Sequence, residues 1–434
     1  MNMNHRLKLL RSAVWIVITI GSYCLIVLNA WPLANDLLNG DGSGLEMPIQ
    51  PFYGFLRIPP SEINESVNAS GHIAADFAQI YFPSSTRINS VDDNPKLDPW
   101  GQKSRYAPFL HYFCALTICK LDYGIASLIH VGVQYLLFIF SYFYAFKLLG
   151  VKSNLSFHFL VANCALLVTP VGLSFFERGQ FSLYVGMAYL WFFLAFIRPN
   201  VFYAATAAIC ACVKLTSFPF LFFALFLFLV RSYKDKQAAQ GIKLGATFTL
   251  TCALLFILFP TASFDYLLVL VEQELKSRAG GSSLIMFWPR WVVKLLPLYL
   301  VSFCTFLAWK NARFFETQLP LMIGIAVLLN LYPTIAFAYS VPSLIAFIPL
   351  LMWWKNLPGV KEGISVKIVV YGFYVFLFLA LIPSAIPESL LDLWGISDID
   401  EAYIYIVLHL CFGAVGLVAT LLLSYKGFRP AFER

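Results

Sequence analysis

Four short polar groups stand out in a chain that is otherwise rich in apolar residues. Together they supply a carboxylate, several cations, and hydroxyl, imidazole and amide groups, which are the side chains that acid–base and phosphate chemistry need. In chain order they are Asp76 with Tyr81; the run from Lys103 to Tyr112, with Arg105, Tyr106 and His111; the run from Phe176 to Gln180, with Glu177 and Arg178; and Lys214 with Pro219.

Asp76 is the strongest candidate for a general base. Its neighbours in the run 75–81 are mostly apolar or aromatic, and poor hydration makes a carboxylate a stronger base. The simpler alternative is an ordinary hydrated acid in the polar segment 35–105. We expect residues 71–87 and 106–121 to form short helices that lie on the membrane surface.

Arg178 and Lys214 lie at the edges of apolar segments, where a cation suits a phosphate group. Arginine binds phosphate as a planar fork and lysine as a point charge. A charge within the membrane is costly enough to indicate a function. The alternatives are a turn pair between Glu177 and Arg178, and a Lys214 side chain that extends to the membrane surface. His111 and Gln180 have the simpler interpretations of packing and helix capping.

A base and a cationic phosphate site are the minimum equipment for glycosyl transfer from a lipid phosphate. The base takes the proton of an acceptor hydroxyl, and the cations stabilise the departing phosphate. The cysteines lack the companion ligands of a metal site, and we expect most of them to act as small apolar residues. No metal and no cofactor are therefore expected.

Composition places the chain among integral membrane proteins. It has 434 residues, of which 60% are hydrophobic and only 12% are charged. Apolar runs of roughly 20 residues recur, which predicts an all-α polytopic protein and excludes a membrane barrel. The net charge of +7 does not indicate nucleic-acid binding, because the cations are scattered between apolar runs.

We predict about twelve spans in a single membrane domain. Its parts are a first helix (12–34), an outer loop with interfacial helices (35–123), a catalytic helical core (124–260), an outer flap (261–290) and C-terminal helices (291–434). After the first helix, the predicted spans are Gly124–Leu149, Leu155–Leu173, Phe181–Ile197, Val201–Val213, Ser217–Val230, Leu244–Phe259, Trp291–Trp309, Leu319–Leu331, Phe337–Trp354, Val366–Ile382 and Tyr403–Ser424.

Charge distribution predicts the orientation of these spans. With a cytoplasmic N-terminus, one side carries most of the lysines and arginines and few of the acids, as the positive-inside rule requires. Both termini are then cytoplasmic, and all four polar groups face outward. We expect a multi-pass protein of a bacterial inner membrane with its site on the periplasmic face.

The ordered set of polar groups resembles glycosyltransferase family 87, the polyprenol-phosphate-sugar-dependent mannosyltransferases of the GT-C superfamily. The resemblance covers about residues 10–230. Its motifs are Asp76-Phe77 with Tyr81, Tyr106-Ala107-Pro108-Phe109, Arg178-Gly179-Gln180 and Lys214 with Pro219.

The resemblance implies a GT-C-like fold and an inverting, metal-independent hexosyl or pentosyl transfer. The donor would be a polyprenyl-phosphate sugar in the bilayer, and the acceptor a lipid or lipid-linked glycan. Asp76 would be the base, Arg178 and Lys214 would contact the donor phosphate, and Gln180 and Tyr81 would line the site. Two departures are a long loop before Asp76, which leaves Asp41 as a rival base, and Phe181-Ser182 where the family often has asparagine.

Two other functions fit part of the pattern. A transporter or flippase for a lipid-linked glycan would use the same cations but would need no base. An O-antigen polymerase or ligase also has many helices and a large outer loop, although that loop usually comes later in the chain.

Overall fold

The computed structural model describes residues 16–17, 19–24, 27–28, 31, 34–35, 38, 75–85, 106–151, 155–177, 179–276, 280–281, 288–296, 299–300, 302, 314–332, 335–336, 338–357, 360, 364–381 and 407–418. Regular structure in this part of the chain is helical except for one two-residue strand pair, which confirms the all-α prediction. Asp41, Lys103, Arg105 and Arg178 lie outside the described residues, as do parts of the predicted helices 12–34, Trp291–Trp309 and Tyr403–Ser424.

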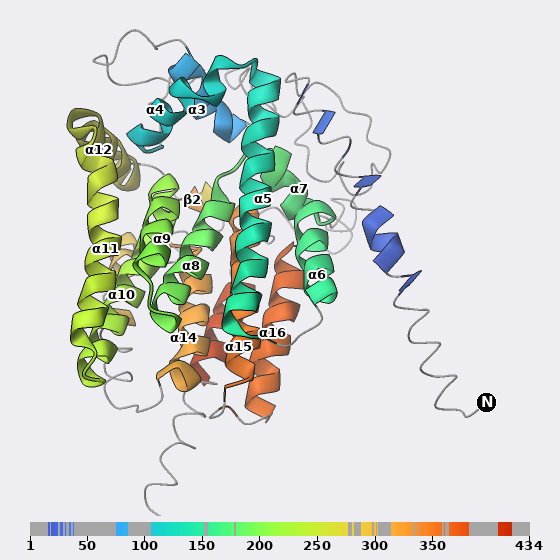
Figure 1. Ribbon diagram of the computed structural model, residues 1–434, viewed down its shortest axis with the longest axis vertical. Coiled ribbons are helices and arrows are strands. Elements are labelled where there is room, and N and C mark those ends of the chain that lie inside the picture. The colour runs from blue at the N-terminus through green and yellow to red at the C-terminus, as the bar shows by residue number, and fades with distance from the viewer. Residues whose placement is uncertain are drawn as a thin grey trace, which may run out of the picture.

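The labelled elements follow one another along the chain in Figure 1. The α-helices are α3 (Ala75–Ser85), α4 (Pro108–Leu116), α5 (Tyr123–Leu149), α6 (Leu155–Leu167), α7 (Pro170–Glu177), α8 (Ser182–Ile197), α9 (Val201–Val213), α10 (Phe218–Lys234), α11 (Ala238–Ile257), α12 (Pro260–Lys276), α14 (Phe314–Leu329), α15 (Ile348–Lys355) and α16 (Ile364–Leu381). Three 3₁₀ helices are η4 (Ile118–Lys120), η5 (Leu215–Ser217) and η7 (Ala338–Phe347), and the strands are β1 (Gly280–Gly281) and β2 (Ile335–Ala336), which pair in parallel.

The helices form a bundle with a small cap across one end. In Figure 1 the long helices of the bundle, among them α5, α8, α9 and α11, run roughly parallel, and α3 and α4 lie across their upper end. Hereafter "the cap" means α3, α4 and η4, and "the upper end" means the end of the bundle that carries it.

Three helical stretches in the described residues have the length and apolar composition to cross a membrane: Tyr123–Leu149, Leu215–Lys234 and Ala238–Ile257. Other apolar helices are shorter. Helices α8 and α9 have 16 and 13 residues, which gives lengths of about 24 and 20 Å, against about 40 Å for α5. At the upper end, α8 begins and α9 ends below the first turn of α5 (Figure 1). The residues that directly precede α8 and directly follow α9 therefore lie within the bundle rather than at its upper edge.

The predicted span Leu155–Leu173 is wrong, because it is two helices that break at Thr169 and Pro170. The Thr169 hydroxyl accepts a hydrogen bond from the Gly172 amide at 3.2 Å, which caps the first turn of α7. A side chain on Gly172 would meet the Ala165 carbonyl oxygen at 2.3 Å, so the two helices fold closely on each other. The break directs α7 toward the turn at Gly179.

The predicted span Phe337–Trp354 is helical but not α-helical throughout. Within it, Ala338–Phe347 form the 3₁₀ helix η7, which contains Pro342, and α15 follows. Proline lacks the backbone donor that an α-helix interior requires. Helix η7 packs closely on α8, since a Cβ on Gly186 would lie 2.5 Å from the Ser343 carbonyl oxygen.

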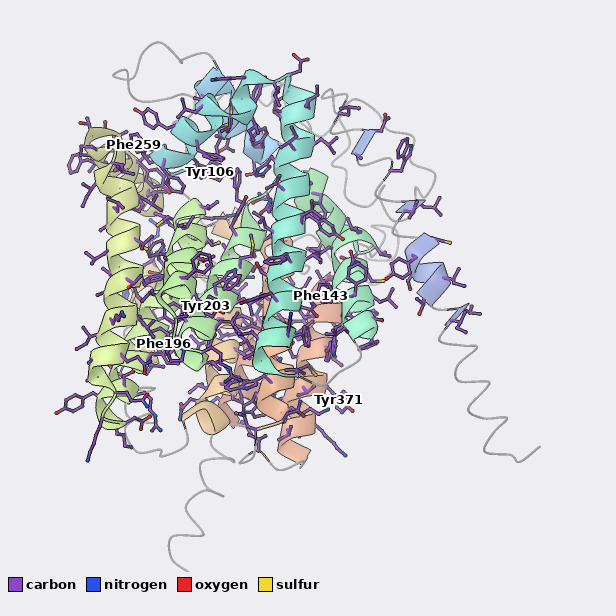
Figure 2. The ribbon with its side chains drawn as sticks, in the orientation of Figure 1. Tyr106, Phe143, Phe196, Tyr203, Phe259 and Tyr371 are labelled. Carbon is purple, nitrogen blue, oxygen red and sulfur yellow. A yellow bond between two sulfur atoms is a disulfide. The ribbon has the colours of Figure 1, made fainter. Side chains whose placement is uncertain are left out.

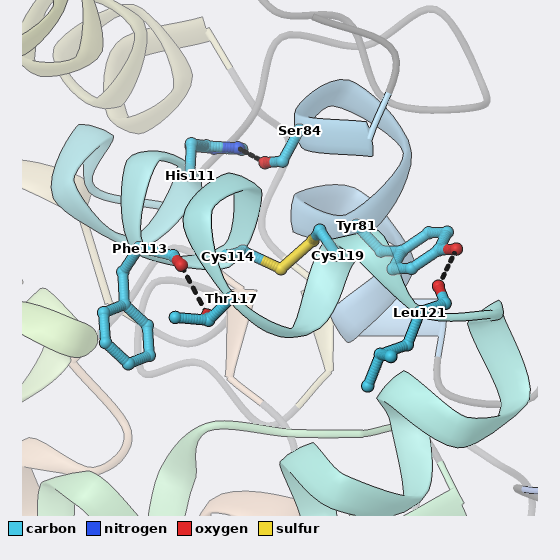
Figure 3. The surroundings of a disulfide bond; sticks show 8 residues. All are labelled: Tyr81, Ser84, His111, Phe113, Cys114, Thr117, Cys119 and Leu121. Atoms are coloured by element: carbon cyan, nitrogen blue, oxygen red, sulfur yellow. Dashed lines mark hydrogen bonds between the residues drawn. A yellow bond between two sulfur atoms is a disulfide. The ribbon is translucent and has the colours of Figure 1, made fainter. Parts of the chain in front are cut away.

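Three contacts hold the cap together (Figure 3). A disulfide joins Cys114 to Cys119, which corrects the expectation that these cysteines are simple apolar residues. The hydroxyl of Tyr81 donates to the Leu121 carbonyl oxygen at 2.6 Å, linking α3 to the end of η4. The side chains of Ser84 and His111 form a buried hydrogen bond of 3.1 Å between α3 and α4. Helices α3 and α4 confirm the prediction of short helices within residues 71–87 and 106–121.

Candidate functional site

The Asp76 carboxylate lies where the cap meets the bundle. It belongs to the first turn of α3, where the helix dipole favours a negative charge. Its Oδ1 accepts a hydrogen bond from the Tyr106 hydroxyl at 3.3 Å, and its Oδ2 accepts one from Gln180 Nε2 at 2.5 Å. Tyr106, labelled in Figure 2, lies just before α4, and Gln180 lies just before α8. Three separate segments therefore meet at this carboxylate.

The side chain of Gln180 connects the carboxylate to the Lys214 ammonium. Its Oε1 accepts a hydrogen bond from Lys214 Nζ at 2.7 Å, and Lys214 Nζ also lies 3.0 Å from Ser182 Oγ. An ionised carboxylate can only accept hydrogen bonds and an ammonium can only donate them, so the donor and acceptor ends of one amide match both. Asp76, Gln180 and Lys214 therefore form one continuous polar chain, 138 residues apart in sequence from first to last.

A tight turn presents Gln180 to its partners. Gly179 has a φ of +60°, a left-handed conformation that favours glycine. Its amide donates to the Phe176 carbonyl oxygen at 2.9 Å, and the Gln180 amide donates to that of Phe175 at 3.1 Å. This pair of bonds is the Schellman motif that ends α7. The motif reverses the chain within three residues and lets α8 start at Ser182.

Two buried side chains of α5 hold the same turn from the other side. His130 Nε2 donates to the Gly179 carbonyl oxygen at 3.2 Å, and Gln134 Nε2 donates to that of Gln180 at 2.6 Å. The two residues are one helical turn apart, so both face the turn. Sequence reasoning did not select them. The available signal was a pair of polar residues at this spacing within an otherwise apolar span.

Lys214 occupies a position suited to an anion. It ends α9, whose start is capped by Asn200 through a bond of 2.8 Å from the Phe202 amide, and it directly precedes η5 and α10. Its contact with Ser182 places the ammonium at the first residue of α8. A helix N-terminus carries a partial positive charge and directs amide groups outward, which together with an ammonium favours a phosphate.

Aromatic rings line the boundary between the cap and this polar chain. Phe77 stacks on the His130 ring with centroids 4.6 Å apart, and Phe181 lies 4.4 Å from the same ring. The rings of Tyr106 and Phe181 are 4.7 Å apart. All four are buried. They keep the cap in contact with the bundle and limit the access of water to Asp76 from this side.

The structure brings together four of the residues that the sequence predicts for the site: Asp76, Tyr106, Gln180 and Lys214. Tyr81 and His111 bond within the cap instead, to Leu121 and Ser84. Burial raises the pKa of the Tyr81 hydroxyl, with a smaller contribution from Asp122. The side chain of Glu177, like Arg105 and Arg178, lies outside the described part of the chain. Within that part, no three His, Cys, Asp or Glu side chains gather as metal ligands would.

Comparison of the whole chain with known protein families, curated proteins and solved structures finds no match.

Proposed function

We propose that the protein is a membrane glycosyltransferase that moves a hexose or pentose from a polyprenyl-phosphate donor to a lipid or glycan acceptor. The observation that carries the proposal is the polar chain from the Asp76 carboxylate through Gln180 to the Lys214 ammonium. One amide side chain separates a proton acceptor from a cation that suits a phosphate. A transfer reaction needs such a pair, with a base at the acceptor hydroxyl and a cation at the leaving phosphate.

The proposed reaction is a single displacement. The acceptor oxygen forms a bond to the anomeric carbon as its proton passes to the Asp76 carboxylate. The bond from that carbon to the phosphate oxygen breaks, and the phosphate leaves with the electron pair. Lys214 and the N-terminus of α8 stabilise the charge that develops on this oxygen. Attack opposite the leaving group inverts the anomeric configuration.

Gln180 and Tyr106 have supporting parts in this proposal. Both donate to the carboxylate and fix its orientation before the acceptor arrives. The same amide accepts from Lys214, so the ammonium is also held in place. Preorganised groups of this kind stabilise a transition state without reorganising during the reaction.

We also propose a GT-C-like arrangement of about twelve spans, with both termini cytoplasmic and the site on the periplasmic face. The ends of α5 and α10 opposite the cap carry Lys147, Arg231 and Lys234, as the positive-inside rule favours for a cytoplasmic surface. The Cys114–Cys119 bridge lies in the cap. Disulfides persist mainly in oxidising compartments such as the periplasm, which favours the same orientation.

Transfer by the purified protein tests the proposal. Radiolabelled sugar on a synthetic polyprenyl phosphate is supplied in detergent, without any gradient, together with lipid and lipid-linked glycan acceptors. We expect labelled product with wild type and a rate about 10²- to 10⁴-fold lower with Asp76→Asn, the usual contribution of a general base. Retention of the full rate by a folded Asp76→Asn protein would contradict the assignment of the base.

The same experiment separates the rival functions. A flippase would move the lipid-linked sugar across a liposome membrane without transferring it, and Asp76→Asn would leave that movement unchanged. A polymerase or ligase would use a diphosphate-linked donor and ignore the monophosphate. Either result would replace the proposal.

A further inference from the structure

Helix α12 exposes a continuous apolar stripe that the proposed reaction does not use. The side chains of Phe264, Leu267, Leu268 and Val271 are 63%, 45%, 50% and 55% exposed. Their spacing of three, four and seven residues places all four on one side of a helix. Single exposed apolar residues are ordinary, but an aligned set indicates a surface that something covers.

A different side of α12 packs against the protein. Ser263 and Tyr266 are buried, the Ser263 hydroxyl donates to the Phe256 carbonyl oxygen at 2.9 Å, and the ring of Tyr266 stacks on that of Phe256. These contacts fix the corner at which α12 turns away from the upper end of α11 (Figure 1). The rings of Tyr112 and Phe259 stack 4.0 Å apart, so the same corner also holds α4.

A third side of α12 is acidic. Asp265 and Glu272 are seven residues apart and therefore lie on the same edge. At 100° per residue, this edge is about 100° from the centre of the apolar stripe and on the other side of it from Tyr266. Passing around the helix, one meets the protein-facing side, then the apolar stripe, then the acidic edge.

The neighbouring helix α11 also has an exposed apolar surface, which favours one candidate to cover the stripe. Helix α11 is long and apolar enough to cross a membrane, and Leu250, Leu254, Ile257 and Leu258 are each more than half exposed on it. This surface suits the lipid chains, and α12, with Phe264 exposed near its start, follows α11 directly in the chain. A helix with one apolar side and one charged edge suits the boundary between lipid and water.

We propose that α12 lies in the membrane–water interface at the upper end of the bundle, as an amphipathic helix whose partner is the phospholipid bilayer. Its stripe contacts the acyl chains, and Asp265 and Glu272 face the water. At 17 residues, the helix is about 25 Å long. Because α12 contacts α4 at the corner, it holds the cap at the level of the lipid headgroups. The proposal does not depend on the transferase reaction.

Depth-dependent fluorescence quenching tests this placement. Val271→Cys and Glu272→Cys are matched variants, since the residues adjoin in the chain but lie on different sides of α12. Both are made in a background with the exposed Cys24 and Cys411 replaced by serine, labelled with the environment-sensitive dye NBD, and placed in phosphatidylcholine nanodiscs. We expect the dye at position 271 to emit at shorter wavelength and to be quenched at least threefold more by doxyl-labelled lipid. The dye at position 272 should be quenched more by aqueous iodide.

Leu267→Cys provides an independent probe on the stripe and should behave as Val271→Cys does. Equal iodide quenching at positions 267, 271 and 272, without quenching by doxyl lipid, would overturn the proposal and assign the stripe to water or a soluble partner. Size-exclusion profiles and melting curves in detergent establish that each variant is folded. Because no activity is measured, failure of the transferase proposal would leave this result unaffected.

Discussion

The cap and the bundle contribute opposite charges to one site and are stabilised by different means. Helices α3 and α4 have 11 and 9 residues, too short to be stable alone in water. A disulfide and two side-chain hydrogen bonds link the parts of the cap, and the buried Phe77 ring packs it against His130 of the bundle. Lys214 instead lies between bundle helices whose interior is packed with buried aromatic rings. The carboxylate thus lies on the small cross-linked part, and the cation lies within the larger bundle.

This difference has a functional meaning within the proposed reaction. The phosphate of a lipid donor is the same in every turnover and needs a fixed cation. The acceptor hydroxyl meets the base on the cap, whose orientation Gln180 and Tyr106 fix. We therefore expect changes in the bundle to affect donor binding and changes in the cap to affect the rate of the chemical step.

Replacement of Lys214 by glutamine should have the largest effect among changes in the bundle. Loss of the ammonium should raise the donor KM and lower kcat/KM by about 10²- to 10³-fold, the usual effect of removing one charge-stabilising donor. Steady-state rates over a range of donor concentrations measure both constants. Lys214→Arg keeps the charge and is the matched control. An unchanged donor KM in Lys214→Gln would argue against a phosphate contact.

Gln180→Glu tests the link between the two parts. A second carboxylate would pair with Lys214 and repel Asp76. The hydrogen bond that Gln180 Nε2 donates to Asp76 would also be lost. We expect kcat to fall on the order of 10-fold or more, equivalent to at least about 1.4 kcal/mol. Gln180→Met, of similar length and uncharged, separates loss of the amide from added charge. If both variants kept the wild-type kcat, the amide bridge would have no role in turnover.

Gly179→Ala should destabilise the bundle at the turn. The left-handed conformation costs an alanine roughly 1–2 kcal/mol, so the melting temperature should fall. The control is Gly132→Ala in α5, where an added Cβ meets no atom within 4 Å. Alanine is favoured over glycine in a helix, so this variant should match or exceed the wild-type melting temperature. Equal melting of the two variants would show that the turn is not under the expected constraint.

The smallest effect is expected from Tyr106→Phe in the cap. The hydroxyl bond to Asp76 is long, at 3.3 Å, and the buried ring still packs on Phe181 in the variant. We expect kcat to fall a few-fold, in line with a net value of about 1 kcal/mol for one hydrogen bond, and the donor KM to stay constant. A rise in the donor KM instead would remove the distinction between cap and bundle.

The sequence was informative where the chemistry of a single residue decided the outcome. Asp76 and Lys214 are candidates because a charge beside apolar runs is costly unless it has partners, and Gln180 is a candidate through the resemblance. The structure gives all three polar partners. Tyr81, a candidate through the resemblance, and His111, on an apolar segment, bond within the cap instead. Spacing along a helix predicts which side chains share a ridge, but not what that ridge contacts.

Features that depend on backbone geometry could not be predicted in this way. His130 and Gln134 bind carbonyl oxygens of a turn 45 or more residues later in the chain, and the sequence does not reveal which carbonyl oxygens face α5. The break at Pro170 is hard to predict because the run 155–173 is mostly apolar, and its hydropathy masks the capping threonine. The predicted span count and the predicted contact of Arg178 with the donor phosphate stay predictions.

The Cys114–Cys119 bond also sets a condition on how the protein is made. The two thiols are five positions apart, but they stay reduced while the chain is in the cytosol. If the cap is exported, its cross-link can close only after that segment has been translocated. A cell strain without periplasmic thiol oxidation would then accumulate inserted protein in which the two cysteines of the cap are still reduced. Purification in strong reductant would yield the same immature species.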